Sequence, residues 1–165
     1  MVAVTPSPLP SGALLARYAD DPANFTDCYR VDVAGTVTLA DYVAAFYTTR
    51  LFKLERGILS VVLKKRATDE DARALGDATS DAYSAWTVEA RSDTQLLMCP
   101  VDGKTRSWFM VEPGEAGATT RLYFGSAVFR QPQHGIAALA FKPLLLFHKL
   151  YSLALLSAAK TRLGR

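Results

Sequence analysis

GIAALAFKPLLLFHKLYSLALLSAAKTRLGR, residues 135–165, is the stretch that decides how this chain folds. A proline fits the first turn of a helix and a glycine often follows its end, so Pro143 and Gly164 predict a helix over about 143–161. With 3.6 residues per turn, one stripe of this helix is expected to face a sheet. That stripe contains Leu144, Phe147, His148, Tyr151, Leu155 and Ala158.

A second stripe, on roughly the opposite side of the helix, contains Lys149, Leu153, Leu156 and Lys160. If its two leucines lie in water, they form a small apolar patch that is suited to self-association. Alternatively, a helix from residues 13–18 or 69–76 covers them. The helix is apolar on almost all sides, so the rest of the chain has to cover most of its surface.

Upstream of this helix, the spacing of hydrophobic residues changes between the period of a strand and that of a helix. Period-two alternation predicts a strand over 28–33. Three helical patterns follow, and the first and third begin with a threonine cap that has acidic residues within the next three positions. These helices are expected at 38–49, 51–64 and 68–76.

From residue 85 onward the period is two again. The alternation and the turn residues between its segments predict a four-stranded antiparallel meander. Its strands are expected at 86–91, 95–99, 106–112 and 121–129. A strand, then helices, then a meander and a long helix is the order of an α+β fold, in which helices pack on one face of an antiparallel sheet.

The N-terminal residues differ in composition from the rest. Three prolines within residues 1–12 are spaced so that neither a continuous helix nor a continuous strand can form, which predicts an irregular lead. We therefore expect an irregular lead over 1–24 and a single domain over 25–165, a length that suits one domain with a sizeable core.

Composition narrows the class of protein and its compartment. Half of the residues are hydrophobic and 21% are charged, which argues against disorder. The N-terminus lacks the basic region and continuous apolar segment of a signal peptide, and charged residues divide the best candidate for a membrane span. Cys28 and Cys99 are expected to be free buried thiols, with one disulfide as the alternative. A cytoplasmic protein without a transmembrane segment is therefore expected.

The net charge of +3 is unevenly distributed. Seven of the 19 basic residues follow Glu115 and no acidic residue does, so the first 115 residues carry 12 basic and 16 acidic side chains. Such asymmetry can indicate a surface for phosphates or anionic lipid. The structural alternative is that the acidic part and the basic C-terminal part meet in the fold.

The segments WTVEAR (86–91) and FHKLYSLALLSAAKTRL (147–163), together with the order of elements, resemble an uncharacterised bacterial branch of the START-like superfamily. This superfamily is also called SRPBCC, helix-grip or polyketide-cyclase/lipid-transport. The resemblance covers about residues 25–163 and lies mainly in element order. It implies a curved antiparallel sheet around a long C-terminal helix, with two or three helices between the first two strands.

The number of strands differs from the usual pattern of that superfamily. Six or seven strands are usual there, whereas the periodicity in this chain predicts about five. Three explanations are open: a strand is hidden within 1–25 or 66–85, the sheet is trimmed, or the assignment is wrong.

The resemblance also implies a function. A START-like domain holds a hydrophobic or amphipathic small molecule or a lipid in a cavity between sheet and C-terminal helix. Members include carriers, hormone receptors, cyclases and chaperone activators, and fold alone does not choose among them. The candidate ligand-binding residues are His148, Tyr151, Phe147, Trp86, Trp108, Tyr123, Glu89 and Arg91.

Each candidate also has a structural interpretation. The aromatic residues could be ordinary core, and alternation does not decide which residues of the last two strands point inward. His148 could contact a ligand, act as an acid or base, or hydrogen-bond a buried partner. Glu89 and Arg91 are expected on the strand face opposite Trp86, either as a polar pair at a ligand or as a solvated ion pair.

Two other function classes stay open beside the carrier. One is an enzyme of the cyclase or hydratase type, with His148 as acid or base assisted by Tyr151 or Glu89. The other is an interaction protein that forms a homodimer or docks on a partner through Leu153, Leu156 and the basic C-terminal tail. Cys28 has no base near it in sequence, so a buried hydrophobic role is expected rather than catalysis.

The sequence lacks the motifs of several other classes. Two histidines 14 residues apart, without a carboxylate at ligand spacing, do not predict a metal site. No P-loop, G-x-S-x-G or G-x-G-x-x-G motif occurs, and no nucleic-acid-binding module is present. We expect no cofactor and no nucleic-acid partner, and we assign no catalytic residue.

Overall fold

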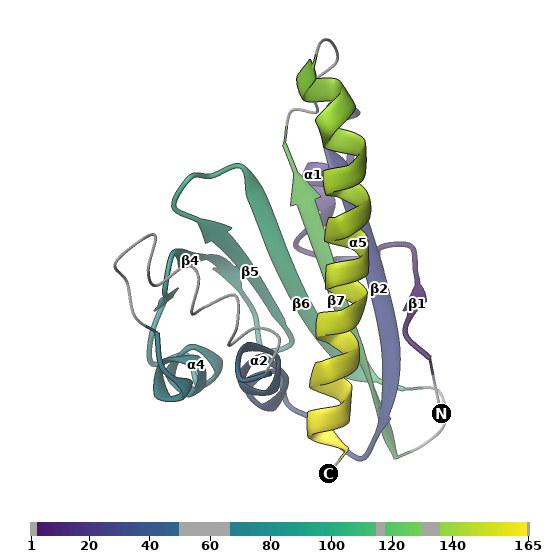
Figure 1. The fold of residues 1–165 in the computed structure, drawn as a ribbon. Coiled ribbons are helices and arrows are strands. Elements are labelled where there is room, and N and C mark those ends of the chain that lie inside the picture. Colours follow the sequence, from purple (N-terminus) through teal and green to yellow (C-terminus); the bar gives the residue numbers. More distant parts are fainter. Residues whose placement is uncertain (1–2, 50–66, 115–117, 130–135, 165) are drawn as a thin grey trace.

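A computed structural model describes residues 3–49, 67–114, 118–129 and 136–164 of the chain, with the side chains of 136–148 excepted. Its elements form one curved antiparallel sheet with helices packed against it (Figure 1). In chain order they are β1 (Thr5–Pro6), α1 (Ala16–Ala19), β2 (Phe25–Ala34), α2 (Leu39–Tyr47), α4 (Asp69–Gly76), β3 (Ala82–Tyr83), β4 (Trp86–Arg91), β5 (Gln95–Pro100), β6 (Thr105–Pro113), β7 (Thr119–Val128) and α5 (Ile136–Leu163).

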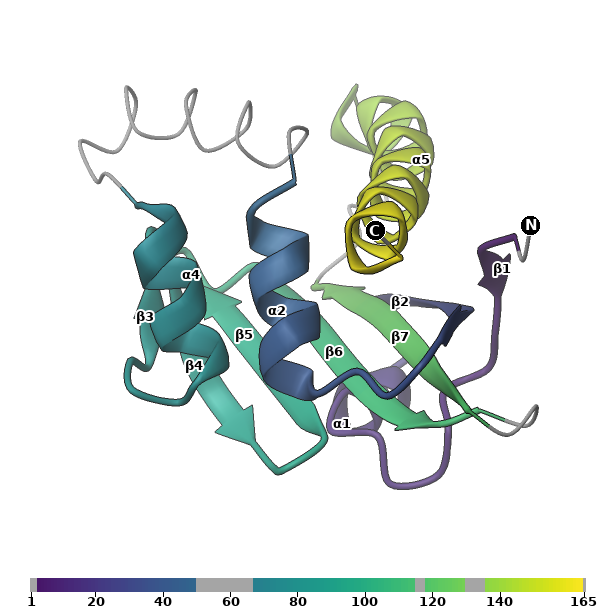
Figure 2. The same cartoon turned by 90° about the horizontal axis from the view of Figure 1, so that it is seen from below.

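The sheet has seven strands in the order β1-β2-β7-β6-β5-β4-β3, and every described pair is antiparallel. Helices α2, α4 and α5 cover one face, which we call the inner face (Figure 2). Helix α1 and residues 9–15 before it, which we call the N-terminal segment, pack on the opposite, outer face. The predicted α+β class and the four-stranded meander β4-β5-β6-β7 are confirmed. The arrangement is compatible with a helix-grip fold.

The predicted number of about five strands is wrong. The additional strands β1 and β3 lie at the two edges of the sheet, within 1–25 and 66–85, and each contains only two residues. A segment of two residues has no periodicity to detect. The first predicted strand is also longer than expected, because β2 pairs with β7 over ten residues, from Phe25 opposite Val128 to Ala34 opposite Thr119.

Two inner-face helices begin at the predicted caps. Asp41 N donates to Thr38 Oγ1 over 3.1 Å, and Thr38 N donates in return to Asp41 Oδ2 over 3.3 Å. Thr68 and Asp71 form the same reciprocal capping box at the start of α4. Each box satisfies two backbone donors that a helix start leaves open. The predicted helix at 51–64 lies outside the described residues.

Helix α5 differs from the prediction at its start. It begins at Ile136, so Pro143 lies inside the helix rather than in its first turn. A proline removes only one backbone donor, and the apolar residues continue on both of its sides. Among the described residues, no helix is long and apolar enough to span a membrane.

The buried side of α5 also differs from the prediction. Ser152, Leu155, Leu156 and Ala159 are almost completely buried, while Tyr151 and Leu153 are only partly buried. Leu156, predicted to face outward, is 0% exposed. The reason is that α5 contacts α2 as well as β2 and β7, so it is covered on two sides. The predicted self-association patch therefore loses Leu156.

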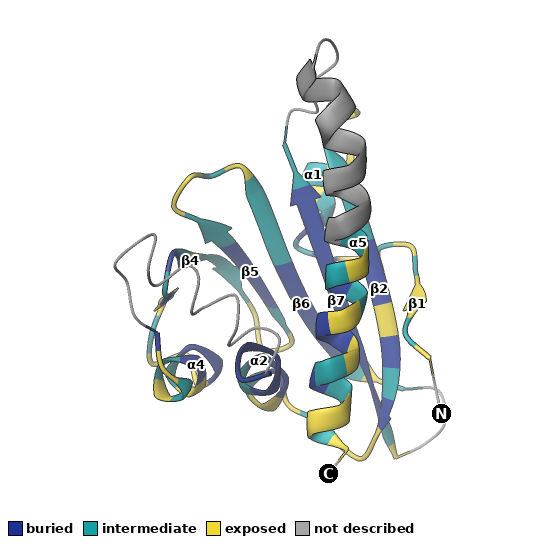
Figure 3. Ribbon diagram, viewed as in Figure 1, coloured by how far each residue is buried: buried dark blue, intermediate teal, exposed yellow. Residues whose placement is uncertain are grey.

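Buried residues run along the middle strands of the sheet and along α2 (Figure 3), and aromatic side chains form the centre of the inner core. The ring of Phe46 from α2 lies 4.8 Å from the ring of Phe109 and 4.9 Å from that of Phe124. Tyr42 and Tyr47 also contact Phe109. Helix α2 is thereby fixed against the middle of the sheet.

The outer face has its own apolar layer, formed with the predicted N-terminal lead. Leu15 is 0% exposed and belongs to a cluster with Cys28, Trp108 and Tyr123. The Gln95 side chain accepts hydrogen bonds from Leu14 N and from Trp108 Nε1, both over 2.9 Å. Leu9 and residues 13–18, which lie within the predicted lead, thus pack against the outer face of the sheet.

We expect Gly125→Ala to destabilise this outer layer by about 1–3 kcal/mol, as overpacking does elsewhere. A Cβ atom at Gly125 would lie 2.8 Å from Leu15 Cδ2 and 2.9 Å from the backbone oxygen of Asp27. Urea unfolding measures the change. Gly164→Ala is the control, because its Cβ would meet only Lys160 O at 3.5 Å. An unchanged urea midpoint for Gly125→Ala would contradict the close approach of Leu15 and the Asp27 backbone to Gly125.

Candidate functional site

The structure divides the predicted ligand-binding residues between the two faces of the sheet. Trp108 and Tyr123 lie in the outer cluster, under the N-terminal segment and away from α5. Trp86 and Tyr151 pack at the margin of the inner cluster. The side chains of Phe147 and His148 are outside the described residues. The predicted aromatic group therefore does not line one cavity.

Glu89 and Arg91 do not share a face, contrary to the prediction. The register of β4 against β5 shifts between Val88 and Ala90, which indicates a bulge, and the simple alternation is lost there. The Glu89 carboxylate accepts hydrogen bonds from the Tyr18 hydroxyl and from Arg106 Nε. Arg91 Nη1 instead donates to Leu75 O at the end of α4, over 2.8 Å. Both side chains are thus engaged by the protein itself.

The Glu89 network fastens α1 to the outer face. The Arg106 guanidinium lies 5.2 Å from the ring centre of Tyr18 and 4.8 Å from that of Phe129, so two rings and a carboxylate surround it. Burial, followed by the hydrogen bond to Glu89, raises the pKa of Tyr18. This neutral phenol donates to the carboxylate at physiological pH. The arrangement is structural, and it engages both carboxylate oxygens of Glu89.

One basic residue of the C-terminal part also has a structural role. Arg121 donates to Asp32 Oδ1 over 2.7 Å and to Asp32 Oδ2 over 3.1 Å. The hydrogen bond to Arg121 lowers the pKa of Asp32. For Arg121, the interpretation that acidic and basic parts meet in the fold is confirmed.

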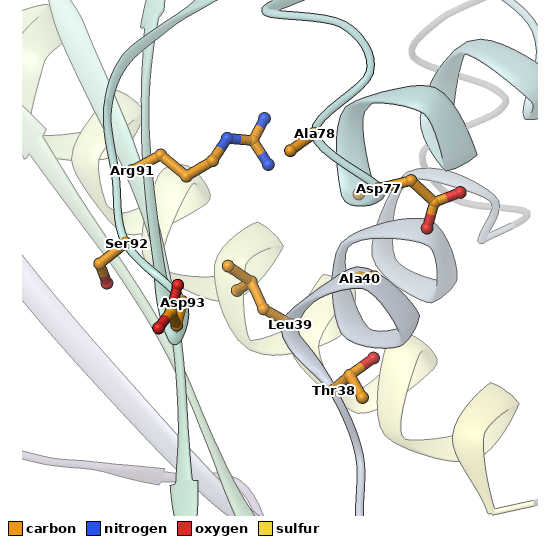
Figure 4. A pocket seen from close by; sticks show the side chains of 9 residues that line it. Thr38, Leu39, Ala40, Asp77, Ala78, Arg91, Ser92 and Asp93 are labelled. Carbon is orange, nitrogen blue, oxygen red and sulfur yellow. The ribbon is translucent and has the colours of Figure 1, made fainter.

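A polar pocket of about 480 Å³ lies between α2, the end of α4 and the turn after β4 (Figure 4). Its lining residues are Thr38, Leu39, Ala40, Gly76, Asp77, Ala78, Arg91, Ser92 and Asp93. Arg91 points toward Ala78, and its Nε is buried without a hydrogen-bond partner among the described residues. Asp77 and Asp93 add two negative charges to the positive charge of Arg91, so the pocket carries charges of both signs.

A larger depression, of about 740 Å³, lies between α5 and the edge of β2, and we call it the edge groove. Its lining is mainly apolar and consists of Pro6, Ser7, Pro8, Leu9, Ala19, Phe25, Thr26, Asp27, Cys28, Tyr29, Lys149, Leu150 and Leu153. The edge of β2 is accessible here because β1 is so short. Beyond β1, the bond from Ser7 N to Cys28 O, of 2.9 Å, continues the pairing.

The wall that α5 contributes is amphipathic. Leu150 is 58% exposed, which is unusual for a large apolar side chain in this molecule, and Leu153 is partly buried beside it. Lys149 Nζ lies 5.0 Å from the ring centre of Phe25 on β2. Such a cation–π contact holds the ammonium group at the groove while its stem covers apolar surface.

The wall that β2 contributes carries one buried carboxylate. Asp27 Oδ1 accepts hydrogen bonds from Ser126 N over 3.1 Å and from Ser126 Oγ over 2.5 Å. Asp27 Oδ2 is buried too, but no described group completes a hydrogen bond to it. Burial, and then the charge of Asp27, raise the pKa of Tyr29 to about 12. Hydrogen bonding between the Tyr29 phenol and the Asp27 carboxylate contributes to the same rise of the Tyr29 pKa.

The two cysteines are free thiols, which confirms that prediction. Cys28 is 6% exposed, and burial, then the charge of Asp27, raise its pKa to about 12. A thiol in this state is a poor nucleophile, as expected. Cys99 is only partly buried, so its predicted burial is wrong.

Neither similarity to known proteins nor a group of metal ligands assigns a function to this chain. No protein-family model matches the chain, and no curated protein matches it at a significant level. Within the described residues, no cluster of three His, Cys, Asp or Glu side chains could hold a metal ion.

Sequence reasoning missed the polar residues of the edge groove. Asp27 lies just before the strand predicted at 28–33, and Lys149 was assigned to the stripe facing away from the sheet. An alternation that began one residue further upstream would have placed Asp27 on the same face as Tyr29. Nothing in the sequence indicates that Lys149 reaches Phe25, more than a hundred residues away.

Proposed function

We propose that this chain is a START-like domain that binds or carries a hydrophobic or amphipathic small molecule between its sheet and α5. The strand order β2-β7-β6-β5-β4-β3, with helices inserted after β2 and a long helix at the end, supports the resemblance. The seven strands agree with the number usual in that superfamily. The proposal does not depend on Trp108, Tyr123 or Glu89, which lie elsewhere.

The edge groove is the observation that carries this proposal. Its volume of about 740 Å³ falls within the range of small-molecule sites, and such sites are mostly apolar with a few polar groups. A ligand that covered Leu150 would remove from water an apolar side chain that is 58% exposed. The enzyme alternative depends on His148, whose side chain is outside the described residues.

The first test is binding of an uncharged apolar fluorophore, N-phenyl-1-naphthylamine, to the purified protein. We expect saturable binding that Leu150→Glu weakens about tenfold or more, because a buried leucine contributes about 1.5–3 kcal/mol and 1.4 kcal/mol corresponds to a factor of ten. Native mass spectrometry and organic extraction of the same preparation would identify any copurifying ligand.

The matched control is Val101→Glu, at an apolar residue that is 74% exposed in the turn between β5 and β6. This variant introduces the same charge but should bind the fluorophore as the wild type does. Absence of saturable binding to the wild type would refute the proposed function. Equal affinity of Leu150→Glu and wild type would place the ligand somewhere other than the edge groove.

A further inference from the structure

We infer that the outward side of α5 docks on an anionic lipid surface, with the edge groove beside the contact. The inference rests on the proposed function, because an amphipathic ligand of the groove is the kind of molecule that a membrane holds. It adds the partner from which the ligand is taken. Three features of α5 support it: an uncharged exposed stripe, basic residues on both sides of this stripe, and an exposed leucine that the stripe shares with the groove.

The exposed stripe is the side of α5 that its neighbours leave open. The helix packs against α2, β2 and β7, and its remaining side is turned away from the sheet (Figure 2). Leu150, Ala154, Ser157 and Thr161 are exposed there. At 3.6 residues per turn they fall within about 60° of the helix circumference and extend over about three turns. No charged side chain interrupts the stripe, so a flat partner can approach it closely.

Basic residues lie on both sides of this stripe. By the same helical geometry, Lys149 and Lys160 fall on one side and Arg162 on the other. Residues 149–164 contain no acidic side chain. Arg162 is exposed and forms no ion pair with a described residue. A negatively charged surface that covers the stripe would therefore meet only cations and uncharged groups of the described part of α5.

The groove beside the stripe has one acidic residue in its lining, Asp27. This carboxylate is engaged inside the protein, because Oδ1 accepts two hydrogen bonds from Ser126 and Oδ2 is buried. Leu150 belongs both to the stripe and to the groove lining, and it is 58% exposed. Contact with acyl chains would remove this apolar surface from water, where it is exposed in the free protein.

Anionic lipid fits the stripe better than the other candidate partners. It offers negative head groups to lysine and arginine and apolar chains to Leu150. A second copy of this chain would bring cations against cations, since its stripe carries the same flanks. A nucleic acid would pair with the cations through its phosphates but would offer Leu150 no apolar surface.

Cosedimentation with vesicles tests the inference. One set of vesicles contains phosphatidylcholine alone, and the other contains phosphatidylcholine mixed with phosphatidylserine. We expect wild type to bind the mixed vesicles at least tenfold more tightly, because each basic residue near an anionic surface contributes about fivefold. This preference should disappear between about 0.1 M and 1 M salt, where the screening length falls from about 10 Å to about 3 Å.

Arg162→Glu should weaken binding to the mixed vesicles at least tenfold, because it replaces an attraction by a repulsion. Lys104→Glu is the matched control, with the same change of charge at an exposed residue in the turn between β5 and β6. It should bind the vesicles as wild type does. Neither residue lines the edge groove, so both variants should keep the wild-type affinity for the fluorophore.

The inference is overturned if wild type ignores the mixed vesicles, binds both kinds equally or prefers a DNA duplex. It is also overturned if Arg162→Glu binds as wild type does or if Lys104→Glu loses as much affinity. In all these cases, fluorophore binding still supports the proposed function. Vesicle binding by a protein that does not bind the fluorophore would remove the proposed function and leave the docking surface. The salt dependence of wild type decides the matter if Arg162→Glu does not fold.

Discussion

Phe109→Ala is expected to lower the free energy of unfolding by about 3–5 kcal/mol, the range seen for large aromatic residues in well-packed cores. Phe109 is 0% exposed on the inner face of β6, and its ring contacts those of Tyr42, Phe46 and Phe124. Its removal leaves a cavity between α2 and the middle of the sheet. Since domains of this size are stable by about 5–15 kcal/mol, a large part of the stability would be lost.

Urea unfolding followed by circular dichroism measures this change. Val101→Ala is the control, because an apolar side chain that is 74% exposed should change the stability by less than about 0.5 kcal/mol. A loss of under 1 kcal/mol for Phe109→Ala would mean that α2 does not pack on β6 as described.

The second large effect is a loss of stability at alkaline pH. Burial raises the pKa of Cys28 from 9.0 to about 12 and that of Tyr29 from 10.0 to about 12. The folded protein holds both protons more tightly than the unfolded chain does. Their contribution to stability is therefore fully present below about pH 9 and is lost as the pH rises toward 12.

For Cys28 alone, the shift from 9.0 to about 12 corresponds to a loss of about 4 kcal/mol at the end of this range, at 1.36 kcal/mol for each pKa unit. Urea midpoints between pH 8 and pH 10.5 measure the slope. Cys28→Ala should reduce the fall between pH 9 and pH 10, where the thiol of the unfolded chain ionises before the tyrosines. Cys99→Ala leaves Cys28 in place and should retain the fall. If the urea midpoints of wild type and Cys28→Ala fall with pH in parallel, burial does not raise the pKa of the Cys28 thiol.

Local signals in the sequence predicted the elements well. The two threonine caps mark the starts of α2 and α4, and the period-two segments mark β4 to β7. These features depend on neighbouring residues alone, so one sequence is sufficient to find them. The two-residue strands β1 and β3 are defined only by their partners, and no local pattern could reveal them.

The direction of side chains could not be predicted, because both faces of the sheet are buried. Trp108 and Phe109 are adjacent in β6 and both are 0% exposed, one under the N-terminal segment and the other under α2. Alternation distinguishes faces only when one of them is polar. The same reason explains the error at α5, where α2 covers the side expected to face water.

The polar groups of the edge groove could not be predicted. The resemblance implied a site between sheet and C-terminal helix, which stays a prediction. The bulge at Glu89 and the contact of Lys149 with Phe25 are tertiary features, and neither leaves a mark in the local sequence. Asp27 continues the alternation of β2, but the predicted strand began one residue too late to include it.

The pairing of β2 with β7 has a consequence for the order of folding. Phe25 lies opposite Val128, so the middle of the sheet joins segments made early and late in synthesis. Contacts so distant in sequence slow folding, because the chain must be ordered over a long loop before they form. The pairing of β2 can therefore be completed only after β7 has been synthesised.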